Sequence, residues 1–110
     1  MLLDWDKTVV REVDVVPGTA FMIRKNIFNK VGGFDKKFFL YFEEFDLCNR
    51  IKDLGWKIYI NPKAKVMHLW EVSAKRSNLD IGEIFRQSRF YYFKKHYGII
   101  LAFLTEMFLR

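Results

Sequence analysis

The chain contains very little cysteine: among its 110 residues only Cys48 carries a thiol. One cysteine cannot form an internal disulfide framework or a zinc site made of several thiolates, and it favours a reducing compartment. Proline occurs twice and glycine six times, and no Pro/Gly/Ser-rich linker divides the sequence. We therefore expect one small folded unit.

Long apolar runs are missing as well. No basic segment followed by an apolar run marks a signal peptide, and the most apolar stretch, residues 99–109, is too short to span a bilayer. Hydrophobic residues nevertheless make up 51% of the chain and aromatic residues 18%, which is enough for a buried core. This composition excludes a disordered tail and an integral membrane bundle.

Acidic charge becomes scarce toward the C-terminus. Residues 1–74 contain 12 basic and 10 acidic side chains, whereas residues 75–110 contain 7 and 3, so the net charges are +2 and +4. The basic final third indicates an anionic neighbour such as phosphate, nucleic acid or a lipid surface, or else a solvated face that maintains solubility. We treat residues 75–110 as a C-terminal helical extension, first basic and then apolar.

Helical and strand patterns alternate along the chain, which predicts an α/β fold with α+β as the alternative. Apolar spacing, a capping-box pattern at Asp80 and terminal glycines mark the helices. The predicted helices cover residues 24–30, 43–54, 80–96 and 99–109. The predicted strands cover residues 19–23, 56–60 and 64–70, and residues 1–12 form an irregular lead-in.

The densest polar cluster lies at the start of the second predicted helix. Glu43, Glu44 and Asp46 place three carboxylates within four residues, next to several aromatic side chains. Crowded carboxylates shielded by aromatic rings cannot all ionise freely, so one should have a raised pKa and could act as a general base. The alternative is an acidic first turn that stabilises its own helix dipole.

Two further polar features are weak on spacing alone. His68 ends a predicted strand, but no second histidine lies at ligand spacing, which favours a structural histidine. Asp4 and Asp6 form a D-x-D pair of the kind that holds a divalent cation, although no apolar strand precedes them.

Residues 89–95 interleave basic and aromatic side chains as nucleic-acid binders do. Two of those rings, Tyr91 and Tyr92, fall on the apolar helix stripe, so we expect no nucleic-acid partner.

Five motifs in order resemble the C-terminal half of family 2 glycosyltransferases, particularly their rhamnosyltransferase-like branch. The resemblance extends over about residues 13–73, with a weaker echo at residues 89–98. The motifs read VPGTAFMIRK at residues 16–25, VGGFD at 31–35, FFLYFEEFDLCNR at 38–50, GW at 55–56 and PKAKVMH at 62–68. Each is ordinary alone, but their order and spacing are specific.

The resemblance implies inverting sugar transfer on the C-terminal half of a GT-A-like mixed sheet with flanking helices. It places the general base at Glu44, with Glu43 and Asp46 at the acceptor mouth. Glutamate replaces the commoner aspartate at the base position, which adds one methylene. Gly18 and Thr19 match the turn near the donor sugar, and His68 matches a ligand of the divalent metal, Mg²⁺ or Mn²⁺, of the complete enzyme.

The same resemblance implies a nucleotide-sugar donor and a saccharide or lipid-linked saccharide acceptor. The family's nucleotide-binding half is not represented in these residues, so we expect the chain to be inactive alone. The alternative is a non-catalytic module that binds a membrane surface or a partner domain through residues 75–110. The apolar end of this extension predicts self-association or lipid contact, which fits a cytoplasmic location at the inner face of the membrane.

Overall fold

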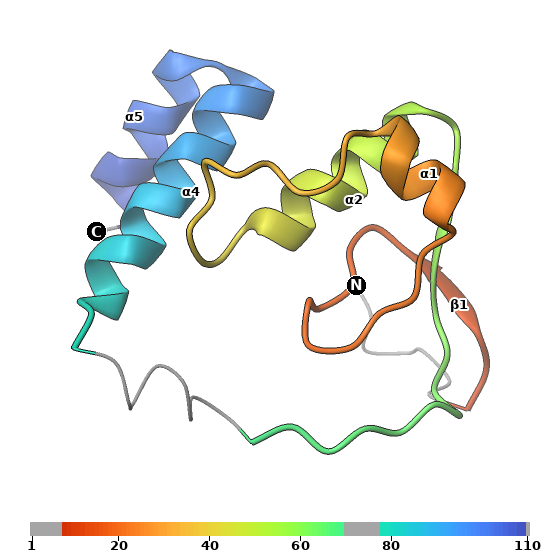
Figure 1. Ribbon diagram of the computed structural model, residues 1–110. Coiled ribbons are helices and arrows are strands. Elements are labelled where there is room, and N and C mark those ends of the chain that lie inside the picture. Colours follow the sequence, from red (N-terminus) through yellow and green to blue (C-terminus); the bar gives the residue numbers. More distant parts are fainter. Residues whose placement is uncertain (1–7, 70–77, 110) are drawn as a thin grey trace.

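The computed structural model describes residues 8–69 and 78–109. In chain order, its elements are β1 (Arg11–Val13), α1 (Lys25–Lys30), α2 (Glu43–Asp53), β2 (Ile58–Ile60), α4 (Ile81–Tyr97) and α5 (Ile99–Phe108). The four predicted helices are confirmed to within one residue at each end. Figure 1 shows α2 in the middle, with α1 on one side and α4 and α5 on the other.

Helix α2 is amphipathic, and its apolar stripe packs against α1. Leu47 and Ile51 form a buried cluster with Ile27 of α1, and Cys48 of α2 is also buried. The stripe was expected to include Leu54, but that residue is 44% exposed. Leu54 follows the last helical residue, where the chain already turns away, so helical spacing no longer predicts its direction.

The sheet is smaller than the sequence suggests. Among the described residues it has two antiparallel strands, β1 and β2, with Arg11 opposite Ile60 and Val13 opposite Ile58. The strand expected within residues 56–60 is confirmed, whereas residues 19–23 and 64–69 form no strand. The end of the supposedly irregular lead-in supplies β1 instead. An apolar run needs a hydrogen-bonding neighbour to become a strand, and local sequence does not reveal that neighbour.

Helices α4 and α5 pack side by side as a hairpin around Gly98. The predicted cap is present, because the Asp80 side chain accepts a hydrogen bond from the Glu83 backbone N–H at 3.1 Å. The expected apolar stripe of α4 is only partly correct: Tyr92 is buried, but Phe85 is 41% exposed.

Charge also joins these two helices. Glu106 of α5 is buried and accepts hydrogen bonds from Arg89 of α4, with a nitrogen–oxygen distance of 2.9 Å.

None of the helices placed here combines the length and apolarity needed to cross a bilayer. The mixed GT-A-like sheet stays a prediction, since two short strands do not test it.

Candidate functional site

The site begins at an unusual turn immediately before α2. Tyr41 and Phe42 both have positive backbone φ angles, 69° and 64°. Residues other than glycine rarely adopt this left-handed backbone conformation. Asn and Asp adopt it more readily than others, but neither Tyr41 nor Phe42 is of those types. Phe42 is also the N-cap of α2 and provides no side-chain hydrogen bond to the first turn. The first turn of α2, with its carboxylates, therefore starts from a strained backbone.

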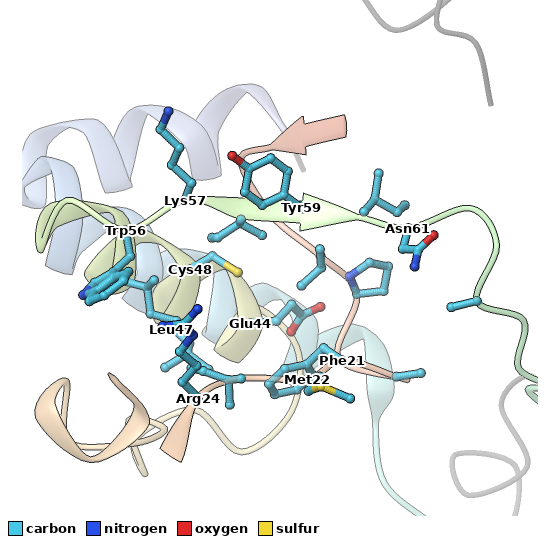
Figure 2. A pocket seen from close by; sticks show the side chains of 18 of the residues that line it. Phe21, Met22, Arg24, Glu44, Leu47, Cys48, Trp56, Lys57, Tyr59 and Asn61 are labelled. Atoms are coloured by element: carbon cyan, nitrogen blue, oxygen red, sulfur yellow. The ribbon is translucent and has the colours of Figure 1, made fainter. Parts of the chain in front are cut away.

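Glu44 in that first turn lines a cavity of about 990 Å³. The cavity lies between α2, the segment before α1 and the region around β2, as Figure 2 shows. In that view Glu44 lies between β2 and the segment with Phe21 and Met22. Among the described residues that line the cavity, Glu44 is the one carboxylate. This volume falls within the range of small-molecule sites.

The Glu44 carboxyl is partly withdrawn from water. Its Oε2 atom is buried and has no hydrogen-bond partner among the described residues. Burial raises the pKa of Glu44 above its ordinary value; its own backbone N–H opposes this effect, and the charge and hydrogen bond of Glu43 add to it. The expectation of one raised carboxyl pKa is thus met at Glu44. A carboxylate of this kind is a better proton acceptor than one in bulk water.

The remaining cavity wall combines apolar and cationic groups. Trp56 and Tyr59 supply ring surfaces, and the lining cations are Arg24 and Lys57. The Arg24 guanidinium lies 5.9 Å from the centre of the Trp56 ring, within cation–π range. The cavity wall is thus mainly apolar and aromatic, with a few polar groups that include one carboxylate and two cations.

Cys48 also lines the cavity, and burial raises the pKa of its thiol. A thiol that holds its proton is a poor nucleophile. We therefore do not expect Cys48 to act as a nucleophile in this cavity.

Asp46, predicted at the acceptor mouth, lies apart from the cavity. Its side chain is fully buried, and its carboxylate lies 2.7 Å from Lys95 Nζ, 2.7 Å from His96 Nε2 and 2.9 Å from Arg50 Nε. Burial alone would raise the pKa of Asp46, but the hydrogen bonds from Lys95 and His96 and the charge of Arg50 outweigh burial and lower it. These contacts tie α2 to α4, which favours a structural role.

Of the other predicted site residues, some line the cavity and some do not. Thr19 lines the cavity with Glu44, whereas Glu43 does not, although its charge acts on Glu44. Gly18 is adjacent: a Cβ built on it would stand 3.9 Å from the Glu44 side chain. That distance is an ordinary contact, so Glu44 alone does not require glycine at this position.

His68 is exposed and does not line the cavity. Within residues 8–69 and 78–109, no three His, Cys, Asp or Glu side chains are arranged to hold a metal ion. The described residues therefore form no complete metal site around His68. Asp4 and Asp6 lie outside the described residues.

Sequence reasoning missed the turn at Tyr41–Phe42 and the cavity rings Trp56 and Tyr59. The turn contains neither glycine nor asparagine, so nothing in the sequence indicated a left-handed backbone. The GW motif at residues 55–56 was noted, but spacing alone could not place the Trp56 ring on the wall of the same cavity as Glu44.

The comparisons indicate a glycosyltransferase-related protein over about half of the chain. Over 58 residues, 53% of the chain, it is 38% identical to the N-acetylglucosaminyl-diphospho-decaprenol L-rhamnosyltransferase of Mycobacterium tuberculosis. Over 56 residues, 51% of the chain, it is 34% identical to Rhamnosyltransferase WbbL of Escherichia coli strain K12.

These similarities are short relative to the relatives themselves. The matched segments cover 19% and 21% of those proteins, so the chain spans about a fifth of their length. No protein-family model matches the chain, and no solved structure matches it. The relationship is therefore to glycosyltransferases in general, carried by one segment.

Proposed function

We propose that this chain supplies the acceptor side and the general base of an inverting, family 2-like glycosyltransferase. The observation that carries the proposal is Glu44: a half-buried carboxyl with a raised pKa that lines the 990 Å³ cavity. The partial similarity to two rhamnosyltransferases supports the reaction class. A GT-A-like arrangement of the complete protein belongs to the same proposal.

In the proposed reaction, Glu44 accepts the proton of an acceptor hydroxyl within hydrogen-bond reach, roughly 2.6–3.2 Å. The hydroxyl oxygen then forms a bond to the anomeric carbon of the donor sugar. The bond from that carbon to the nucleoside diphosphate breaks on the opposite face, so the configuration inverts. Glu43 contributes by keeping the Glu44 carboxyl a strong proton acceptor, since its negative charge raises the pKa of Glu44.

The proposed acceptor is a saccharide, free or linked to a lipid diphosphate. The mycobacterial relative is named for L-rhamnose transfer to N-acetylglucosaminyl-diphospho-decaprenol. The side chains on the cavity wall suit contact with such a saccharide. Trp56 and Tyr59 offer ring surfaces on which a sugar can lie, while Arg24 and Lys57 offer hydrogen-bond donors to hydroxyl or phosphate oxygens.

The donor and the metal require residues beyond those described. The relatives are about five times longer than the segment they share with this chain, and we assign nucleotide-sugar binding to that further length. A divalent metal is implied by the family resemblance. His68 alone does not form its site here, so no step of the proposed reaction depends on it.

A segment exchange tests the proposal. The matching segment of the mycobacterial relative is replaced by that of this chain, and transfer of radiolabelled sugar to the relative's own acceptor is measured. We expect the chimera to be active and its Glu44→Gln variant to lose about 10²–10⁴-fold in kcat with little change in donor affinity. The amide keeps the shape of the carboxylate but cannot accept the proton.

Asp53→Asn is the matched control, because Asp53 lies on the same helix, is exposed and lies outside the cavity. Its activity should equal that of the chimera. Full activity in Glu44→Gln would show that the base lies elsewhere and would refute the proposed role.

A further inference from the structure

The backbone before α2 needs an external support, and α4 provides contacts to it. Tyr41 and Phe42 adopt left-handed conformations consecutively, which are costly for aromatic residues and persist only when the surroundings hold them. The start of α2 offers no side-chain cap that could do so. The Phe42 carbonyl oxygen accepts the first helical hydrogen bond, from the Asp46 N–H at 3.0 Å. A change in the backbone conformation of Phe42 therefore moves the whole first turn of α2.

Three residues on one face of α4 contact this turn. The Phe85 ring centre lies 5.4 Å from that of Tyr41 and 5.3 Å from that of Phe42. Tyr92 lies 5.5 Å from Phe42 by the same measure. Ser88 is buried, and its hydroxyl donates a 2.6 Å hydrogen bond to the carbonyl oxygen of Leu40. Residues 85, 88 and 92 are spaced by three and four, so a single helix face makes all these contacts.

We propose that the α4 face formed by Phe85, Ser88 and Tyr92 holds the strained Tyr41–Phe42 turn and thereby positions the Glu44 carboxylate in the cavity. These three are positioning residues, since none of them lines the cavity. A catalytic role for this arrangement rests on the proposed function, whereas the structural coupling between α4 and Glu44 does not depend on that function.

The coupling follows from the short distance along the chain. Glu44 comes two residues after Phe42, and its buried Oε2 has no hydrogen-bond partner among the placed residues that would hold it there. Its position therefore depends on the backbone of the first turn and on its neighbour Glu43. If the turn relaxes toward an ordinary conformation, the first turn of α2 rotates and water reaches the carboxyl. The pKa of Glu44 then falls toward its ordinary value.

The test uses the 110-residue chain and side-chain carboxyl NMR, which needs no substrate. In Phe85→Ala we expect the pKa of Glu44 to fall by about half a unit or more, roughly a threefold change in its protonation equilibrium. The Asp46 amide should exchange with solvent about tenfold faster. Phe85→Tyr keeps the ring and should restore both values. Because Phe85 is 41% exposed, the fold should survive its removal.

Phe90→Ala is the matched control: it removes an α4 ring that packs on Phe103 of α5 instead, and it should leave Glu44 unchanged. Ser88→Ala removes only the hydrogen bond to Leu40 and should give a smaller shift in the same direction. An unchanged pKa of Glu44 in folded Phe85→Ala, or in Ser88→Ala if Phe85→Ala unfolds, would overturn the inference. A chimera with active Glu44→Gln would refute the proposed base while leaving this coupling intact.

Discussion

At the scale of single residues, two carboxylates in one helical turn have opposite environments. Glu44 lines the cavity, and burial raises its pKa. Asp46, two residues further on, is surrounded by Arg50, Lys95 and His96, which lower its pKa despite its burial. Residues two apart on a helix point in different directions, so one faces the cavity and the other faces α4.

This difference predicts a stability role for Asp46. Asp46→Asn leaves the cationic groups around it without their shared counter-ion, and we expect a loss of about 2–4 kcal/mol in the free energy of unfolding. This loss in stability is smaller than that expected for a fully buried ion pair, because the side chains of Lys95 and Arg50 are 29% and 21% exposed. Urea unfolding followed by circular dichroism measures it, and Asp53→Asn should change little. Equal stability of the two variants would contradict the prediction.

The sign of the pH dependence follows from the lowered pKa. The unfolded chain binds a proton at Asp46 near pH 3.9, whereas the folded chain does so only at lower pH. The stabilisation is therefore present above about pH 4 and is lost as the pH falls through the folded value. Asp35 acts in the same direction, since hydrogen bonds from the Lys37 backbone, Lys95 and Tyr91 outweigh its burial and lower its pKa. Asp46→Asn should weaken this acid dependence but not abolish it.

At the scale of elements, all four helices could be predicted, but only the strand within residues 56–60 of the three expected strands is present in the part of the chain that the structure describes. The i, i+4 spacing of Leu47 and Ile51 and the cap at Asp80 are local signals, and α2 and α4 follow them. Strand formation at residues 19–23 depends on a hydrogen-bonding neighbour elsewhere. The sequence indicated Glu44 through its resemblance to a family motif, but the fold alone separates Glu44 from Asp46, because that separation depends on where α4 packs.

The end of α1 gives an element-scale prediction. Gly32 and Gly33 both have positive φ angles, 83° and 72°, so alanine strains either position by about 1 kcal/mol. A Cβ at Gly33 would also stand 3.2 Å from the Phe28 ring, whereas one at Gly32 meets open space. Gly33→Ala should therefore reduce the free energy of unfolding by about 1–3 kcal/mol, more than Gly32→Ala. Urea unfolding compares the two, and equal losses would show that the ring yields freely.

At the scale of the whole molecule, and among residues 8–69 and 78–109, α5 packs on one side, against α4. Ala102 and Glu106, one helical turn apart, are buried against α4. The opposite face is apolar and exposed, with Ile100 at 76%, Met107 at 65% and Phe108 at 77%. Large exposed apolar faces are uncommon on monomeric proteins and mark association surfaces. The predicted apolar end of the extension is thus a real surface of the folded chain.

This surface carries the last prediction. We expect the chain to self-associate as its concentration rises, or to bind anionic vesicles through α5, whose neighbouring helix ends in basic residues. Ile100→Glu combined with Phe108→Glu should abolish both behaviours, because each glutamate places a negative charge on the exposed face without disturbing Ala102. Val10→Glu, at a similarly apolar and 55% exposed position near β1, is the control and should change neither. Sedimentation equilibrium measures association, and flotation with phosphatidylglycerol vesicles measures lipid binding. A chain that stays monomeric throughout the concentration series and does not float with vesicles would show that the α5 face has no such role.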